Sequence, residues 1–209
     1  MLPGEDIRRF FKDELKKHGA SAKGVGWKDD AAQNIRFEEL IRIIKPEKPF
    51  TLNDLGCGAG DILQLLELRF KGQYTYHGFD MLQEMVTVAT ERYAKQLKVH
   101  FSLLNDYHAM PIADYTIASG IFNVKNSSED AQWLDYILDT IGVMSRASAK
   151  GFAFNALTSY SDKELMRSDL FYSDPLVLFD YCKKHFSKNV AILHDYGIYD
   201  FTILVRKEL

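Results

Sequence analysis

The chain has 209 residues, of which 46% are hydrophobic and 26% are charged, a composition typical of soluble globular proteins. This length predicts a single domain, residues 1–209, with enough chain to bury a complete core. The net charge of −3, with no basic stripe along the chain, argues against a DNA-binding surface.

Two further absences narrow the class of protein. Cys57 and Cys182 are the only cysteines and lie far apart, which argues against a disulfide framework and predicts no metal site. No apolar run approaches the roughly 20 residues that span a bilayer, and the charged N-terminus lacks the apolar core of a signal peptide. We therefore expect a cytoplasmic protein without a membrane partner.

The predicted elements begin with two helices, residues 5–17 and 29–44, which would form an N-terminal helical cap or lid over residues 1–49. From residue 50 onwards, short apolar strands alternate with helices, which predicts a mostly parallel sheet with helices on both faces. The predicted strands are residues 50–55, 74–79, 99–104, 114–119 and 150–157. The predicted helices are residues 61–70, 82–97, 128–147 and 175–186.

Three segments depart from this alternation. The fourth predicted strand begins only ten residues after the third ends, so a short turn of helix or a loop replaces the usual crossover helix. Residues 157–174 are polar and aromatic with weak periodicity, and they are the predicted substrate cap. Residues 189–196 and 200–207 resemble two strands joined by a short connection, which predicts a hairpin and an antiparallel edge.

The stretch "LNDLGCGAGD", residues 52–61, places Gly56, Gly58 and Gly60 between a strand and a helix. Glycine permits positive φ angles and close approach of a ligand to the backbone. The dinucleotide fingerprint G-x-G-x-x-G would require glycine at Asp61, and an acid there repels a pyrophosphate. Asp54 beside the turn strengthens this argument. The turn is therefore expected to meet a ligand with a cationic part.

Two more acids follow strands at the same edge of the predicted sheet. Asp80 ends the second strand, where a carboxylate can accept from both hydroxyls of a ribose. Asp106 follows the third strand, where a carboxylate can accept from an exocyclic amine. Ser119 and Gly120 end the fourth strand beside the glycine turn. Two alternatives stay open: Asp106 as a helix cap, and the glycine turn as a purely structural feature.

The stretch "DLGCGAG", together with Asp80 and Asp106, resembles the S-adenosylmethionine (SAM) binding core of the class I, Rossmann-like methyltransferases over roughly residues 50–206. The resemblance implies an α/β fold, a three-layer αβα sandwich whose seven-stranded, mostly parallel sheet has the order 3-2-1-4-5-7-6 and an antiparallel C-terminal strand. It implies an enzyme, a transferase with SAM as cofactor and S-adenosylhomocysteine (SAH) as product. The SAM-binding core would be residues 50–209, with the cap inserted around residues 157–174.

The family's cofactor contacts can be carried over residue by residue. The glycine loop would meet the methionine part of SAM through Asp54, Gly56, Cys57 and Gly58. Asp80 would hold the ribose and Asp106 the adenine, with Met81, Leu82 and Tyr107 beside the base. Ser119 and Gly120 would complete the site, and Arg36 could pair with the cofactor carboxylate. Cys57 is expected to pack through its small side chain, because no base lies near it in the sequence.

The methyl acceptor is predicted to be a small molecule. The stretch "SGIFNVKN" after the fourth strand lacks the Asp/Asn-Pro-Pro-aromatic motif of amino-methylating DNA enzymes, and neither cysteine has the context of a cytosine C5 nucleophile. The candidate acceptor-side residues are Trp27, Gln33, Phe122, Asn123, Tyr160 and Tyr172. For the N-terminal segment and for each aromatic side chain, packing is the alternative interpretation.

A general base is needed only when the acceptor must lose a proton during the transfer. His108, His194 and Tyr196 are the weak candidates for that role. Three other functions stay open: a non-catalytic methyltransferase-like scaffold subunit, a methyltransferase acting on RNA or protein, and a nucleotide-dependent oxidoreductase. We expect a monomer or a homodimer.

Overall fold

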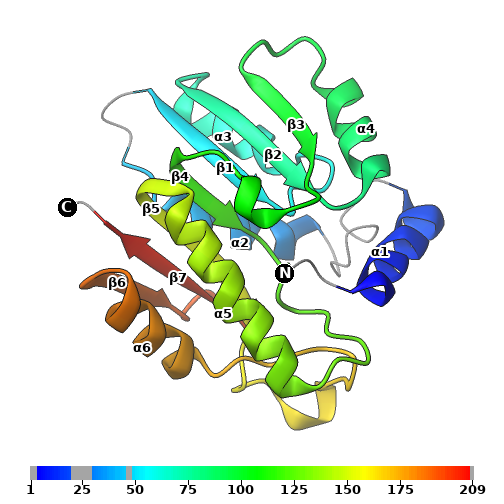
Figure 1. The fold of residues 1–209 in the computed structure, drawn as a ribbon, viewed down its shortest axis with the longest axis vertical. Helices are drawn as coiled ribbons and strands as arrows, with labels where there is room; N and C mark the ends of the chain where they lie inside the picture. Colours follow the sequence, from blue (N-terminus) through cyan, green and yellow to red (C-terminus); the bar gives the residue numbers. More distant parts are fainter. Residues whose placement is uncertain (1–3, 20–29, 46–48, 208–209) are drawn as a thin grey trace.

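The computed structural model describes residues 4–19, 30–45 and 49–207, and its centre is a seven-stranded sheet (Figure 1). The order of the strands is β3-β2-β1-β4-β5-β7-β6. Strand β7 pairs antiparallel with both neighbours and therefore runs opposite to the other six strands. The predicted order and the antiparallel C-terminal strand are confirmed. The strands are β1 Phe50–Leu55, β2 Tyr74–Asp80, β3 Val99–Leu103, β4 Ala113–Ala118, β5 Ser148–Leu157, β6 Asn189–Leu193 and β7 Asp200–Arg206.

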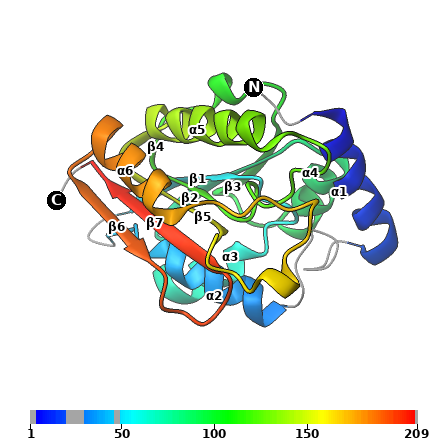
Figure 2. The ribbon, with the colours of Figure 1, turned by 90° about the horizontal axis from the view of Figure 1, so that it is seen from below.

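Helices cover both faces of the sheet, which makes the predicted three-layer sandwich (Figure 2). On one face lie α2 (Asp30–Ile41), α3 (Ile62–Phe70) and α4 (Gln83–Arg92), and on the other lie α5 (Asp130–Arg146) and α6 (Pro175–His185). Two apolar cores follow from this arrangement, one under α5 and α6 and one under α2 and α3. Helix α1 (Glu5–His18) lies beyond the carboxyl ends of β2 and β3.

Helix α4 ends at Arg92, five residues earlier than the sequence predicts. Tyr93 is the reason, because its side chain turns inward. Its hydroxyl donates to the carbonyl of Gly60 at 3.0 Å, and its ring stacks on Phe101 with centroids 5.9 Å apart. The packing of one aromatic side chain therefore ends a helix whose amphipathic pattern would permit another turn.

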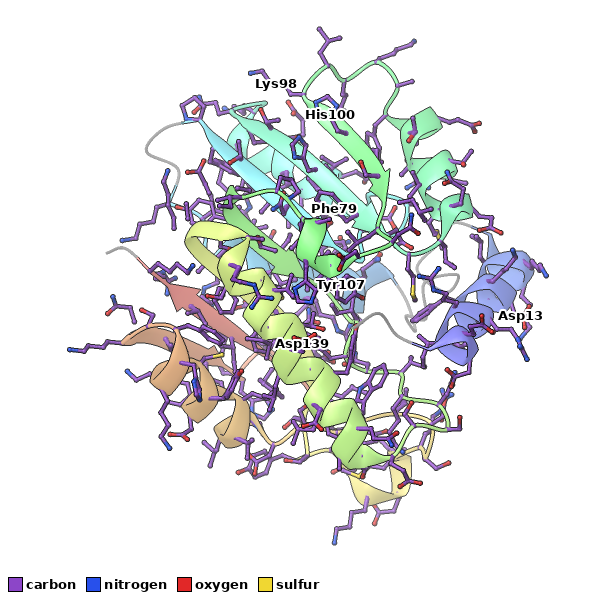
Figure 3. The ribbon with its side chains drawn as sticks, viewed as in Figure 1. Asp13, Phe79, Lys98, His100, Tyr107 and Asp139 are labelled. Atoms are coloured by element: carbon purple, nitrogen blue, oxygen red, sulfur yellow. The ribbon has the colours of Figure 1, made fainter. Side chains whose placement is uncertain are left out.

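The short connection between β3 and β4 is a single 3₁₀ turn, Tyr107–Ala109, as the short spacing predicts. The α5 face of β2 and β3 consequently has no crossover helix of its own. Phe79 and His100 stand on this face, and His100 is exposed (Figure 3). His77 and His100 are paired in register there, with ring centroids 5.2 Å apart.

The two N-terminal helices are attached by polar contacts, α2 to the sheet and α1 to α4 and the loop before it. In α2, Arg36 forms a buried ion pair with Asp200 at the start of β7, with Nη2 and Oδ2 2.5 Å apart. In α1, Lys12 pairs with Glu84 at 2.5 Å, and the Arg8 guanidinium donates to the carbonyl of Met81 at 3.4 Å. Within the described residues, no helix is long and apolar enough to cross a membrane.

Candidate functional site

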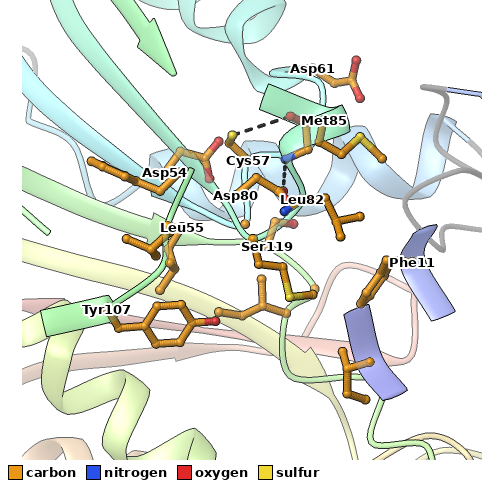
Figure 4. Close-up of a pocket in the computed structure, with 18 of the residues that line it drawn as sticks. Phe11, Asp54, Leu55, Cys57, Asp61, Asp80, Leu82, Met85, Tyr107 and Ser119 are labelled. Carbon is orange, nitrogen blue, oxygen red and sulfur yellow. Dashed lines mark hydrogen bonds between the residues drawn. The ribbon is translucent and has the colours of Figure 1, made fainter. Parts of the chain in front are cut away.

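A cavity lies where the carboxyl ends of β1 and β4 diverge, which is the topological switch point of the sheet. About 890 Å³ of space between its walls is not filled by atoms, and this figure includes the open solvent at its mouth. Figure 4 shows its wall. The lining residues are Ile7, Phe11, Gln33, Phe37, Asp54, Leu55, Gly56, Cys57, Gly58, Asp61, Phe79, Asp80, Met81, Leu82, Met85, Leu104, Tyr107, Ser119, Gly120, Ile121 and Tyr136.

The glycine turn forms one wall, and its backbone conformation requires glycine. Gly56, Gly58 and Gly60 have φ angles of 76°, 54° and 76°, in the left-handed region. Most of the backbone donors of the turn bond within the protein. The N–H groups of Gly56 and Cys57 both donate to the carbonyl of Phe79, and the N–H of Gly60 donates to the carbonyl of Cys57. The turn is therefore not a phosphate cradle, in agreement with the acids beside it.

Asp80 is held at the centre of the site by two backbone donors. Gly58 N–H donates to Oδ2 and Leu82 N–H to Oδ1, each at 2.9 Å (Figure 4). Burial raises the pKa of Asp80, while these hydrogen bonds oppose the shift. Each carboxylate oxygen keeps a further lone pair for a ligand. The side chain is thus a fixed double acceptor at the wall of the cavity.

Asp54 lies deeper and has a different partner. Its Oδ2 accepts from the hydroxyl of Tyr76 at 2.7 Å, and the carboxyl group is buried. Burial raises its pKa to about 7, and the charges of Asp80 and Asp61 add to this shift, although the Tyr76 hydrogen bond opposes it. Near neutral pH the group is therefore partly protonated, and a cation in the cavity would favour its ionised form.

A buried amide fixes the loop after β4. Asn155 on β5 accepts from Gly120 N–H at 2.8 Å and donates to Ser119 Oγ at 3.2 Å. Nothing in the sequence marks this residue as part of the site, because an asparagine within a strand carries no signal until the neighbouring strand is known. Asn155 is a positioning residue: it holds Ser119 and Gly120 in the cavity wall but does not line the cavity itself.

Most of the predicted cofactor-binding residues meet in this cavity, and two do not. Arg36 is turned away from it into the ion pair with Asp200, which removes the predicted pairing with a cofactor carboxylate. Asp106 is exposed and caps the 3₁₀ turn, with Oδ1 accepting from His108 N–H at 2.9 Å. Tyr107, directly after it, lines the cavity instead.

The predicted acceptor-side residues are largely placed elsewhere, with Gln33 as the exception that lines the cavity. The structure corrects Phe122, which is fully buried against Phe154 with centroids 5.6 Å apart. Asn123 is also structural, because its Oδ1 accepts from Leu157 N–H at 3.0 Å. Trp27 lies outside the described residues.

The segment 157–174 packs away from the cavity. Its backbone pairs with the loop after β4, where Lys125 N–H donates to the carbonyl of Asp169 and Phe171 N–H to the carbonyl of Asn123. Tyr160 is exposed, and the Tyr172 hydroxyl accepts from Arg167 N–H at 2.9 Å. None of these residues lines the cavity, so the predicted cap lies beside the site.

The three weak base candidates also lie outside the cavity wall. His108 contacts Arg146, His194 packs between Tyr160 and Phe201, and the Tyr196 hydroxyl bonds to Thr202. Cys57 does line the cavity, but burial and the nearby carboxylates raise the pKa of its thiol well above the usual value, so it is no nucleophile.

The apolar part of the wall comes mainly from residues that the sequence analysis did not single out. Helix α1 contributes Ile7 and Phe11, and α2 contributes Phe37. Ile121 follows Gly120 directly, and Tyr136 reaches the cavity from α5, where its hydroxyl lies 3.1 Å from that of Tyr107. The amphipathic spacing of α1, α2 and α5 predicts that they are helices, but only their packing shows which of their residues face the site.

Comparison with known proteins supports this arrangement. A family model described as a methyltransferase domain matches residues 53–138. The Mycobacterium tuberculosis protein named "Putative methyltransferase Rv1506c" is 49% identical over 168 residues, covering 80% of this chain and 99% of that protein.

Two solved structures show the same fold at low sequence identity. The N-terminal domain of EvdMO1 with bound SAH matches with a TM-score of 0.63 at 14% identity, covering 99% of this chain and 98% of that one. The pyocyanin biosynthetic protein PhzM matches with a TM-score of 0.65 at 14% identity, covering 99% of this chain and 65% of that one.

The strand order, the glycine turn and the buried acid at the end of β2 are features expected of an enzyme that uses an adenosyl cofactor. The relative with 49% identity, which is named as a putative methyltransferase, then assigns the chain to a family. The chain belongs to the class I SAM-dependent methyltransferases.

The residues of the cavity fit SAM. Asp80 presents two acceptors to a diol, and Met81, Leu82 and Tyr107 supply an apolar surface for a base. The three acids of the wall suit a ligand that carries a sulfonium and an ammonium. The positive φ angles of the glycines keep side chains out of the space beside them.

The raised pKa of Asp54 predicts a pH-dependent stability in the absence of ligand. Between pH 4 and pH 7, Asp54 is protonated in the native state and ionised in the unfolded state. Unfolding then releases a proton, so the free energy of unfolding falls as pH rises through this window. We expect Asp54→Asn to gain stability relative to wild type with rising pH, on the order of 2–4 kcal/mol by pH 8.

Urea unfolding at pH 5, 6, 7 and 8 measures this difference. Asp135→Asn, an exposed substitution on α5, is the matched control and should stay parallel to wild type at every pH. A constant gap between Asp54→Asn and wild type would show that Asp54 does not titrate in this range.

Proposed function

We propose that this enzyme transfers the methyl group of SAM to a small-molecule acceptor held in the same cavity, beneath α1 and α2. The observation that carries the proposal is the cover over the site. Ile7 and Phe11 from α1 and Phe37 from α2 line this side with apolar side chains, beside the polar Gln33. A covered apolar cavity suits a small ligand better than a segment of a macromolecule, which needs an open groove.

The neighbouring structure PhzM supports the same class of acceptor, since it is named for the biosynthesis of a small molecule. Helices α1 and α2 take the role of the N-terminal cap in this proposal. The segment 157–174 supports the loop after β4 instead, through its backbone bonds to Asn123 and Lys125.

Each wall of the cavity has a role in the proposed reaction. SAM supplies a methyl group already activated by its sulfonium. Asp80 holds the ribose, Asp54 and the glycine turn hold the methionine part, and Met81, Leu82 and Tyr107 flank the base. The rate then depends on how well the acceptor atom is aligned, and this alignment falls to the side chains under α1 and α2.

Gln33 is the polar side chain of α2 that is placed to orient the acceptor. Its side chain is largely buried and lines the cavity, and its amide has no hydrogen bond to another side chain or to the backbone of the other described residues. An amide in a cavity wall without a protein partner can form hydrogen bonds with a ligand. We expect it to bind the acceptor close to the atom that receives the methyl group.

The experiment is a methylation assay with SAM and a panel of small phenols, amines, thiols and indoles, with SAH formation and product mass as readouts. For an acceptor that turns over, Gln33→Ala should raise KM about tenfold and leave SAH binding within twofold. Asn34→Ala, the exposed neighbour on α2, is the control and should behave as wild type. Tight SAH binding combined with methylation of RNA or protein only would contradict the proposal.

A further inference from the structure

We infer that the acceptor carries no anionic group: it is a molecule with an apolar or aromatic body that reacts through a neutral hydroxyl, amine or thiol. This inference rests on the proposed function and deepens it, because it names the chemical class of the substrate. It follows from the charges, the hydrogen-bond donors and the apolar surface of the cavity.

The charged side chains in the described wall all have the same sign. They are Asp54, Asp61 and Asp80, and no lysine, arginine or histidine stands among the described lining residues. Proteins recognise carboxylates and phosphates through fixed cations and clustered N–H donors. An anionic acceptor would enter a cavity that offers it carboxyl groups and no fixed cation among the described lining residues.

Two arginines beside the cavity are paired with carboxylates, Arg36 with Asp200 and Arg92 with Asp61 at 2.5 Å. Arg8 donates to the carbonyl of Met81 at 3.4 Å, and its charge favours the ionised form of Asp80 in the cavity wall. These contacts hold α2, α4 and α1 in place. Reorienting one of them toward a ligand would break a contact that shapes the site.

The backbone donors of the cavity offer no substitute for a cation. Gly56, Cys57 and Gly58 donate their N–H groups to Phe79 and Asp80, and Gly120 donates to Asn155. The carboxylate of SAM differs from that of an acceptor, because SAM brings its own ammonium and sulfonium charges. A second anion would bring no such compensation.

The reacting atom must also have a free lone pair and carry no positive charge before the transfer. A protonated amine has no lone pair, and the sulfonium would repel a second cation. In the step itself, the lone pair of the acceptor atom forms the new bond to the methyl carbon. The carbon–sulfur bond breaks with its electron pair staying on sulfur, and the proton of the acceptor group passes to solvent.

The rest of the wall matches an apolar body. Ile7, Phe11, Phe37 and Ile121 face the cavity, and burial of their surface against a ring or an alkyl group favours binding. Gln33, which is uncharged, can accept from a hydroxyl or amine of such a molecule and donate to its ring substituents. Together these side chains select a neutral molecule with one polar end.

Matched acceptor pairs test the inference. Each neutral acceptor is compared with its carboxylated analogue, for example 4-ethylphenol with 3-(4-hydroxyphenyl)propionate and 4-ethylaniline with 3-(4-aminophenyl)propionate. We expect kcat/KM, measured by SAH release, to be at least tenfold higher for the uncarboxylated member. Equal or higher values for the carboxylated members would overturn the inference.

Binding of each acceptor to the SAH complex, measured as a thermal shift, gives the same comparison without turnover. If no pair is methylated, the proposed function fails, but stronger stabilisation by the uncarboxylated members would still support the charge selection. Stronger stabilisation by the carboxylated members would refute it. The two failures are therefore distinguishable.

A charge placed in the wall should reverse the preference. Gln33→Lys puts an ammonium beside the acceptor and is expected to shift the neutral-to-carboxylated ratio of kcat/KM at least tenfold toward the carboxylated member. Asn34→Lys adds the same charge on the exposed side of α2 and should leave the ratio unchanged. A ratio that moves equally in both variants would show that the cavity charge does not select the acceptor.

Discussion

Replacing Asp80 with alanine is expected to weaken the binding of SAM and SAH at least a hundredfold. The carboxylate is fixed by Gly58 N–H and Leu82 N–H and has two acceptor lone pairs left for the ribose. Hydrogen bonds to a charged group contribute about 1.5–3 kcal/mol each, so losing two of them removes about 3 kcal/mol or more of binding free energy. The substitution also leaves both backbone donors without their partner.

Calorimetry with SAH measures this loss without turnover. Asp135→Ala on α5 removes an exposed acid and serves as the matched control, with binding expected within twofold of wild type. The SAH affinity of Asp80→Asn should lie between those of Asp80→Ala and the wild type, since an amide keeps one acceptor oxygen. Wild-type affinity in Asp80→Ala would mean that the cofactor is bound in another way.

The second large effect is expected from Gly56→Ala. Gly56 has a φ of 76°, which disfavours any other residue by about 1–2 kcal/mol. An added Cβ would also overlap Cγ2 of Ile121, and overpacking adds about 1–3 kcal/mol. The free energy of unfolding should therefore drop by about 2–5 kcal/mol. SAH binding should weaken as well, because Ile121 belongs to the cavity wall.

Gly197→Ala separates the two causes. Gly197 has nearly the same φ, 72°, but an added Cβ there would meet no atom within 4 Å. Urea unfolding of Gly197→Ala should thus show the conformational penalty alone, with unchanged SAH binding. If both variants lose the same stability and both bind SAH normally, the collision with Ile121 has no effect and the turn tolerates a side chain.

The parts of the site that could be predicted are those encoded by neighbouring residues. A glycine turn between a strand and a helix, followed by an acid at the end of the next strand, is a local pattern, and parallel strands bring such ends to one edge. Gly56, Gly58 and Asp80 consequently lie together in the cavity, as the sequence implies.

The parts that could not be predicted depend on distant partners. Arg36 is polar and lies on the helix over the site, but Asp200 comes from a strand 164 positions away, and their buried ion pair decides its direction. Phe122 follows the fourth strand, yet the loop turns it into the core under α5 rather than toward the cavity. Asn155 acquires its role only once β5 lies beside β4.

The ion pair between Arg36 and Asp200 also bears on the order in which the protein matures on the ribosome. Every residue named in the cavity wall precedes residue 137, so a nascent chain that has emerged as far as α5 already carries the whole wall. Helix α2 still lacks its anchor at that stage, because Asp200 has not been translated. Binding of SAM beneath an anchored α2 therefore requires β7, so we expect the cofactor to stabilise the nascent chain only once Asp200 has joined the sheet.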